Sequence, residues 1–460
     1  MRGVSALEEY PNFVESTTAD GILRGVEREE PGARYAVYLG VPYAEPPVGS
    51  LRFMPPREIS PWTAHDDGGP QFGGTTDCLT LDIYVPSTAA GTQSGNVSGN
   101  ASSSHADGTG RGKAVLAYIT SGDPEVGRDG STKLTRDEII VVVIRHRVGV
   151  FGYLSVDQEL ALRWIQRNVG FLGGDPNRVT LFGGYQSYVS LHLYTTSDTG
   201  HGPLFQRLID DGGATTPGDI LQEPPVDATY ELGVLLNCTV SEKSVLLQCL
   251  RSRSENDIVA LVAVLNGDEN VSNIWRPFFD TNVMSTSITR QNVDVIVGFS
   301  SADNEIGLRA ARNRNIDFVG NGILPPFLYN VSTKLSRVEP GLSGSSLLQT
   351  LIRQQYGDWS QPETQSSLGF VNSAEVVNDL DILLPGFSFL EDVTSESPTS
   401  DVYLFVCESN MTNPHKSRLL DILGFLGMNS SQALRLDEER QLSDDIRHYF
   451  INFIIDGYVE

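Results

Sequence analysis

The amino-acid sequence predicts an α/β fold with a central, mostly parallel, twisted sheet flanked by helices. Ile139–Ile144 is apolar and almost wholly β-branched, which is typical of a parallel strand covered on both faces. Strand-like and helical segments alternate along the chain. The stretch Arg178–Ser190, RVTLFGGYQSYVS, has the pattern of a strand, a glycine turn and a helix. That is the local geometry of a nucleophile elbow, which holds a reactive side chain exposed above a sheet.

The composition of the 460 residues is that of a globular chain, with 40% hydrophobic and 20% charged residues. The formal net charge of −25 argues against nucleic acid as a partner, because phosphates need a basic surface. No stretch approaches the about 18 apolar residues of a transmembrane helix, and no internal repeat is present. We therefore expect a single domain over residues 1–460.

The first part of the chain alternates between extended segments and loops. Gly21–Phe53 begins extended, and its prolines exclude a regular helix and predict a surface loop. Leu79–Val85 alternates as a strand does. The tract that follows, at about residues 87–112, is rich in Ser, Gly and Asn and has almost nothing to bury, so we expect a disordered loop.

The remainder of the chain supplies most of the predicted sheet and its helices. A second buried strand is expected at Ala114–Ile119, and the amphipathic pattern of Asp157–Asn168 predicts a helix. Residues 173–177, GGDPN, predict a turn before the strand at Arg178–Phe182, and Gly183–Gly184 predict a tight turn after it. Further strands are expected at Leu204–Asp210, Val293–Val297 and Asp401–Val406, and further helices at Ser346–Tyr356 and Leu436–Ile455.

Seven Asn-X-Ser/Thr sequons occur, two of them in the Ser/Gly-rich tract. One sequon carries little weight, but seven predict a secreted or ectodomain glycoprotein. The first residues hold no signal-peptide core, and the chain stops abruptly, so we expect it to be incomplete at both ends. The expected glycosylation sites are Asn96, Asn100, Asn237, Asn270, Asn330, Asn410 and Asn429.

Two of the four cysteines, Cys238 and Cys249, enclose a short loop. Its closure by a disulfide in an oxidising compartment would stabilise the fold by about 3 kcal/mol. The alternative is a pair of buried thiols, and the sequon that overlaps Cys238 favours the disulfide. Cys78 and Cys407 have no evident partner, because connectivity cannot be deduced from sequence.

Several long motifs, in order along the chain, resemble the type-B carboxylesterase/cholinesterase family of α/β-hydrolases. The resemblance runs from about Gly21 to the C-terminus and implies the α/β-hydrolase fold. It also implies the Cys238–Cys249 disulfide, since these cysteines occupy the place of a family disulfide. The motifs are LGVPYAEPPVGSLRF (39–53), TTDCLTLDIYVP (75–86), RVGVFGYL (147–154), LALRWIQRNVGFLGGDPNRVTLFG (160–183) and WRPFFD (275–280).

The family's chemistry depends on an elbow that differs in this chain. Where the family has Gly-Glu-Ser-Ala-Gly, residues 183–187 are Gly-Gly-Tyr-Gln-Ser. In such enzymes a serine hydroxyl attacks the ester, activated by a histidine that a carboxylate orients. The phenol of Tyr185 is too long to attack from the same Cβ and would fill the acyl site. Ser187 and Ser190 belong to the predicted helix, where neither would project as an elbow nucleophile does.

The oxyanion hole and the triad's acid depart from the family as well. A His-Gly-Gly run supplies the family's oxyanion hole, whereas this chain has TSGD at 120–123. Ser121 and Gly122 hold the degenerate positions, and the aspartate beside them has the wrong charge for stabilising an oxyanion. Glu305 or Asp303 falls at the position of the acid, although an isoleucine interrupts the family's Glu-Gly and a surface carboxylate is the competing interpretation.

The position of the triad's histidine falls near Arg418. His415 is close, but it lies in a Pro-His-Lys loop and is interpreted as a solvated histidine. His146, His192 and His448 lie in or beside predicted elements and are interpreted as packing or surface residues. Nucleophile, base and oxyanion hole therefore all depart from the family pattern.

Such a combined loss resembles the family's non-catalytic members, which include neuroligin-like adhesion proteins and the cholinesterase-like domain of thyroglobulin. The segments at 293–310 and 419–427 resemble the thyroglobulin domain more closely. The hypothesis is an inactive extracellular domain that acts through a protein partner or as a homodimer, in adhesion or in secretion and dimerisation of a larger precursor. The helix at Leu436–Ile455 could supply a dimer surface, although docking on the sheet would equally explain its apolar positions.

The alternative hypothesis is a carboxylic ester hydrolase with a non-standard nucleophile. The resemblance implies no cofactor and no metal under either hypothesis.

Overall fold

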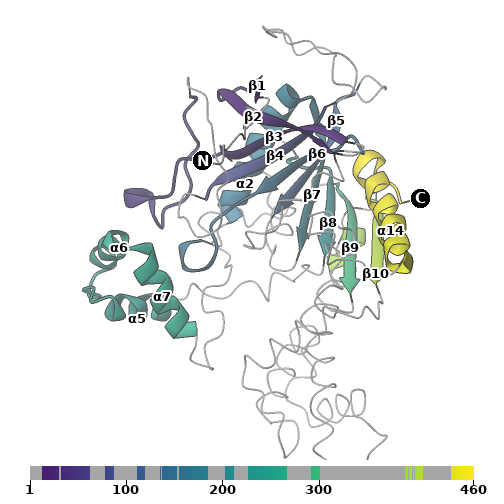
Figure 1. Cartoon of the computed structure of the whole chain (residues 1–460). Coiled ribbons are helices and arrows are strands. Elements are labelled where there is room, and N and C mark those ends of the chain that lie inside the picture. The colour runs from purple at the N-terminus through teal and green to yellow at the C-terminus, as the bar shows by residue number, and fades with distance from the viewer. Residues whose placement is uncertain are drawn as a thin grey trace, which may run out of the picture.

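The fold is seen in a computed structural model of the chain (Figure 1). It describes residues 13–30, 33–62, 78–87, 111–119, 135, 137–152, 155–184, 203–211, 226–266, 292–300, 389–391, 393–395, 397, 399–407 and 437–459. Among these residues no helix is long and apolar enough to cross a membrane.

One ten-stranded sheet is the centre of the described structure (Figure 1). Its strands are β1 (Phe13–Thr17), β2 (Ile22–Glu30), β3 (Ala33–Pro42), β4 (Thr80–Pro86), β5 (Lys113–Ile119), β6 (Ile140–Ile144), β7 (Gly174–Gly184), β8 (Arg207–Asp211), β9 (Asp294–Ser300) and β10 (Val402–Cys407). They lie in the order β1-β2-β3-β4-β6-β5-β7-β8-β9-β10. Neighbours from β1 to β6 in this order pair antiparallel, and neighbours from β6 to β10 pair parallel. The predicted fold class, an α/β fold on a mostly parallel sheet, is confirmed.

Apolar runs predicted the central strands correctly. All five residues of β6 are buried, as are all seven of β5. Their side chains alternate between the two faces of the sheet, and each face is covered by helix. The predicted strands at Ala114–Ile119 and Ile139–Ile144 coincide with β5 and β6 within one residue.

The predicted tight turn at Gly183–Gly184 was wrong. Both glycines belong to β7, and Gly183 pairs with Ile119 of β5 and with Asp210 of β8, because pairing partners on both sides override the turn preference of glycine. The GGDPN segment lies mostly within the bounds of β7, which begins at Gly174, but its register against β5 is irregular, since Gly174 pairs with Lys113 and the next pair joins Val179 to Val115. The N–H of Asn177 donates to Asp175 Oδ1 at 2.9 Å, so the predicted turn is present as a local irregularity at the start of the strand.

Two helices cover the two faces of the sheet. α2 (Ser155–Asn168) packs Leu160, Leu162 and Trp164 against one face of β5, β6 and β7. α14 (Asp437–Asp456), the long yellow helix in Figure 1, packs Phe450 and Phe453 against the opposite face. Alternate residues of one strand therefore enter different cores.

The end of α14 is held by two arginines of the sheet. Arg178 Nη2 donates a hydrogen bond to the carbonyl oxygen of Ile455 at 2.9 Å, and Arg207 Nη1 donates to that of Ile454 at 3.0 Å. The last carbonyls of a helix lack intrahelical donors, and cations near this end are favourable. Docking on the sheet thus accounts for the apolar positions of this helix.

A smaller helical group lies beside the sheet (Figure 1). It consists of α5 (Val226–Leu235), α6 (Lys243–Ser252) and α7 (Glu255–Asn266), whose inner side chains form a separate apolar cluster. Arg52 follows the short helix η1 (Gly49–Leu51). Its Nη1 donates to the carbonyl of Arg253 at 2.7 Å, and its own carbonyl accepts a hydrogen bond from Arg251 Nε at 2.9 Å. These bonds join the group to the loop after β3.

Replacing Phe453 by alanine tests the docking of α14. Phe453 is 0% exposed and lies edge-on to Tyr403 at 5.9 Å between ring centroids. We expect Phe453→Ala to lower the free energy of unfolding by about 3–5 kcal/mol, because it leaves a cavity in the core. Tyr449 on the same helix is 46% exposed, so Tyr449→Ala should change stability by no more than about 0.5 kcal/mol. Urea unfolding measures both, and equal losses would contradict the docking.

Candidate functional site

The carboxyl ends of the parallel strands share one edge of the sheet, which is where ligand sites of α/β folds lie. β5 ends at Ile119, β7 at Gly184, β9 at Ser300 and β10 at Cys407. In the sequence, each predicted catalytic position follows one of these strand ends. The structure describes the strand ends, which lie at the same edge of the sheet.

The predicted site residues themselves lie outside the described residues. These are Tyr185, Ser187, Ser190, Ser121, Gly122, Asp303, Glu305, Arg418 and His415. Their roles remain predictions. β7 is described through Gly184, the residue that precedes Tyr185 in the sequence.

A buried ion pair lies between the loop after β6 and the first turn of α2. Arg147 Nη2 donates to Asp157 Oδ1 at 2.5 Å and Arg147 Nε donates to Asp157 Oδ2 at 2.8 Å, with side chains only 3% and 0% exposed. Burial by itself lowers the pKa of Arg147, but the hydrogen bonds and charge of Asp157 leave that pKa above its ordinary value. The guanidinium therefore stays charged, and its Nη1 donates to the carbonyl of Met54 at 2.7 Å.

A second ion pair joins β4 to the same loop. Arg145 Nη2 donates to Asp82 Oδ2 at 2.6 Å, and Asp82 Oδ1 accepts the N–H of Gly40 at 2.9 Å. The hydroxyl of Tyr43 donates to the carbonyl of Arg145 at 2.8 Å. Burial, followed by the nearby charge of Asp157, raises the pKa of Tyr43 well above its usual value, so its hydroxyl remains protonated and able to donate.

The prediction of a surface loop after β3 was therefore partly wrong. Tyr43 and the following Ala44 are buried in the main core. The hydrogen bond from Tyr43 to Arg145 satisfies the phenol, which allows an aromatic side chain to enter the core. The helix-breaking prolines are evident in the sequence, but no local pattern indicates that Tyr43 would bond to a residue as distant as Arg145.

The described histidines match their interpretation as packing or surface residues. His146 is buried, with Nδ1 3.0 Å from the carbonyl oxygen of Arg147 and Nε2 3.3 Å from Gln158 Nε2. His448 is exposed on α14, beside Asn452. His192 lies outside the described residues. Within the described part of the chain, no three His, Cys, Asp or Glu side chains are grouped as metal ligands would be.

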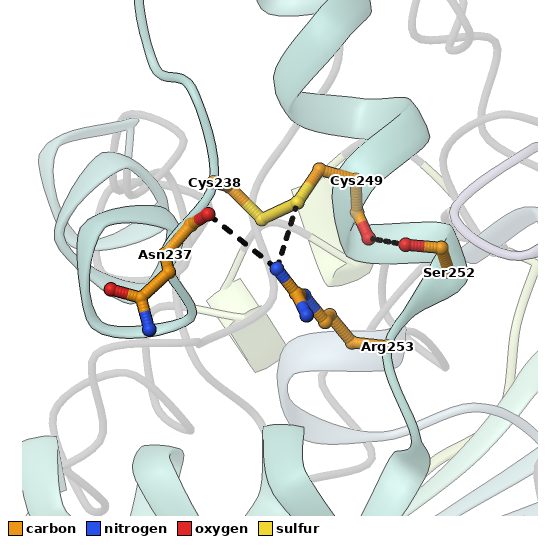
Figure 2. Close-up of a disulfide and its surroundings, with 5 residues drawn as sticks. All are labelled: Asn237, Cys238, Cys249, Ser252 and Arg253. Atoms are coloured by element: carbon orange, nitrogen blue, oxygen red, sulfur yellow. Dashed lines mark hydrogen bonds between the residues drawn. A yellow bond between two sulfur atoms is a disulfide. The ribbon is translucent and has the colours of Figure 1, made fainter.

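The predicted disulfide is confirmed by the structure (Figure 2). Cys238 and Cys249 are bonded, with their Cα atoms 5.8 Å apart. Cys78, by contrast, is a half-buried thiol. Asn237 lies next to the disulfide and is exposed. The other six sequon asparagines, at 96, 100, 270, 330, 410 and 429, lie outside the described residues.

Comparison with known protein families shows to which family this chain belongs. The sequence model of the carboxylesterase family matches residues 12–458. The chain belongs to the carboxylesterase family. Its match to that family spans both ion pairs, the elbow strand and the disulfide.

Individual relatives of this carboxylesterase-family chain are distant. It is 25% identical to the mouse protein named Pyrethroid hydrolase Ces2a over 479 residues, which is 91% of this chain and 79% of that protein. It is 25% identical to human Cocaine esterase over 505 residues, 96% of this chain and 83% of that protein. It is 29% identical to mouse Neuroligin-3 over 402 residues, 71% of this chain and 46% of that protein. The aligned part thus amounts to less than half of Neuroligin-3, and to 44% of mouse Acylcarnitine hydrolase.

Breaking the inner ion pair should destabilise the whole fold. We expect Asp157→Ala to lower the free energy of unfolding by about 3–5 kcal/mol, because it leaves the Arg147 charge buried without its carboxylate. The matched control is Glu159→Ala on the same helix, whose partly exposed pair with Arg163 is worth about 0.3–0.5 kcal/mol. Thermal unfolding followed by circular dichroism distinguishes the two variants. If Glu159→Ala lowers the free energy of unfolding as much as Asp157→Ala does, the buried pair contributes no more to stability than the partly exposed one, and the prediction is wrong.

Proposed function

We propose that this carboxylesterase-family chain is a catalytically inactive, cholinesterase-like extracellular domain that acts through protein contacts. The observation that carries the proposal is Tyr185 directly after Gly184, where β7 ends and the family places its nucleophilic serine. Acyl transfer needs a short side chain whose hydroxyl reaches the ester carbon beside its base. A phenol at the same Cβ carries its oxygen past that point.

The other missing parts support the same proposal. After β5 the chain has TSGD rather than His-Gly-Gly, so the glycine N–H donors of an oxyanion hole are reduced and a negative charge is added. Arg418 occupies the region of the triad's histidine. Meanwhile the mostly parallel sheet of the α/β-hydrolase fold is retained, and the buried ion pairs of Arg147 and Arg145 hold the loops around it. A domain that has lost its catalytic residues but retains its fold is expected to act through contacts made by its surface.

Three features support an extracellular setting. The seven sequons and the Cys238–Cys249 disulfide are typical of the secretory pathway, because disulfides persist in oxidising compartments. Neuroligin-3 is among the relatives, and the elbow departures resemble both the neuroligin-like adhesion proteins and the thyroglobulin domain. The proposed role is adhesion to a protein partner, or secretion and homodimerisation of a larger precursor, by a single domain over residues 1–460.

A second candidate function is ester hydrolysis with Ser187 or Ser190 as a relocated nucleophile. The relatives named as hydrolases or esterases favour it, since they match up to 96% of this chain. Both serines follow Gly184, the last residue of β7, within six positions along the chain.

An organophosphate probe distinguishes the two functions. We expect no stoichiometric labelling of the wild-type chain, and no ester turnover from Tyr185→Ser, because one restored hydroxyl still lacks its base and oxyanion hole. Mass spectrometry of the labelled protein and a chromogenic ester assay are the measurements, with an active carboxylesterase as the positive control. Labelling at Ser187 or Ser190, with turnover abolished by the corresponding Ser→Ala change, would establish the hydrolase instead.

A further inference from the structure

Asn237 lies just beyond α5 in a fixed backbone conformation. Its φ is +54°, in the left-handed region that glycine and asparagine tolerate best. Its N–H donates to the carbonyl of Val234 at 2.9 Å, and the N–H of Cys238 donates to that of Gly233, also at 2.9 Å. These are the two hydrogen bonds of a Schellman motif, which ends a helix by satisfying its last carbonyls. Asn237 is thus the left-handed residue of this motif.

The disulfide fixes the next residue of the same segment. Cys238 is buried in the apolar cluster of α5–α7 and bonded to Cys249 of α6. Arg253 Nη2 lies 3.5 Å from the carbonyl oxygen of Asn237 and 3.6 Å from Cys249 Sγ (Figure 2). The backbone around Asn237 is therefore held by hydrogen bonds on both sides and by one covalent bond.

The same segment is a sequon, Asn237-Cys238-Thr239. Asn237 and Thr239 are exposed, whereas the cysteine between them is buried. The side-chain amide of Asn237 points away from the disulfide in Figure 2. A glycan on Nδ2 would therefore project into solvent without displacing the disulfide, the Schellman hydrogen bonds or Arg253.

Glycan transfer to this sequon conflicts with a closed disulfide. A transferase must hold the amide of Asn237 and the hydroxyl of Thr239 together in its own site, which requires the intervening backbone to leave the protein. With the disulfide open, this movement breaks two main-chain hydrogen bonds and the weak contact of Arg253 and exposes the side chain of Cys238, but it breaks no covalent bond. With it closed, Cys238 is tied to α6 and the sequon cannot leave.

We propose that Asn237 is an N-glycosylation site whose occupancy is set by competition with closure of the Cys238–Cys249 disulfide. The proposal rests on the extracellular setting proposed above. If the disulfide closes before the glycan is transferred, the acceptor is withdrawn from the transferase. If the glycan is transferred first, the disulfide can still close, because Nδ2 and the sulfurs lie on different sides of the segment (Figure 2).

Both reactions balance with ordinary reagents of the secretory pathway. In glycan transfer, Asn237 Nδ2 loses a proton and bonds to the anomeric carbon of a lipid-linked oligosaccharide, whose lipid diphosphate leaves. In closure, one cysteine forms a mixed disulfide with an oxidised dithiol carrier, and the thiolate of the other cysteine displaces that carrier. The carrier leaves as a dithiol, having taken up the two electrons and two protons.

The test measures glycan occupancy at each sequon of the full chain. The chain, preceded by a cleavable signal peptide, is translated into microsomes, deglycosylated in ¹⁸O-water and analysed by mass spectrometry. Cys249→Ser keeps the sequon but prevents closure, and we expect occupancy at Asn237 to rise about twofold or more because the competing exchange reaction is absent. Wild-type chain translated with a reductant should show the same rise, which removes any dependence on the folding of the variant. Occupancy at Asn330, a sequon 93 positions further along the chain, should not change.

Two further variants separate the glycan from the backbone. Thr239→Ala abolishes the sequon but keeps Asn237 in the motif, and Asn237→Gly removes the acceptor but keeps the left-handed conformation. Both should close the disulfide normally and carry no glycan at this site.

The proposal is overturned if Asn237 is unmodified in wild type and in Cys249→Ser while other sequons carry glycans. It is equally overturned if occupancy is the same with the disulfide open and closed. The proposed setting is judged separately, by whether the native chain reaches the medium or the surface of the cells that express it. A native chain retained in the cytosol would contradict that setting and leave the microsomal result intact.

Discussion

The paired charges of Arg147 and Asp157 fix how the main helix meets the sheet. A guanidinium and a carboxylate in the interior are tolerated only because each satisfies the other. Their hydrogen bonds join the loop after β6 to the start of α2, and Arg147 also holds the carbonyl of Met54. The other end of α2 is also tied to a distant segment, since Asn168 Nδ2 donates a hydrogen bond to the carboxylate of Asp20 at 2.7 Å. Three other parts of the chain, at Asp20, Met54 and Arg147, are thus aligned with one helix.

The local sequence pattern predicted most of the described strands because burial on both faces leaves a simple signature. β5 and β6 are continuous apolar runs, and such runs have few alternatives to a central strand. The pattern failed where neighbours decide the conformation. Gly183 and Gly184 lack the side chains that disfavour turns, but Gly183 pairs with β5 and both glycines pair with β8. The turn propensity of glycine is a local property, whereas strand pairing here joins residues far apart in the sequence. The turn propensity therefore could not predict the pairing.

The candidate site was predictable only in part, and for a related reason. Motif order placed Tyr185 after the elbow strand, and β7 is described up to the residue before it, Gly184, so the role of Tyr185 stays a prediction. The buried network was not foreseen, because a charged residue in a sequence resembles a surface residue until its partner is known. Asp82 and Arg145 are 63 positions apart and meet only in the folded chain. Several family motifs therefore contain residues that the buried interior requires. Their presence predicts the fold and does not by itself predict catalytic activity.

The capping of α14 by Arg178 and Arg207 has a consequence for the living cell. The carbonyls that these arginines bind lie 277 and 247 positions downstream of them. A ribosome therefore releases β5, β6 and β7 long before the helix that shields one of their faces exists. During that interval an apolar surface including Leu116, Tyr118 and Phe182 is without its native cover, which is a condition that favours aggregation. Biosynthesis of this chain thus calls for chaperones that hold the nascent sheet until residues 437–456 have emerged.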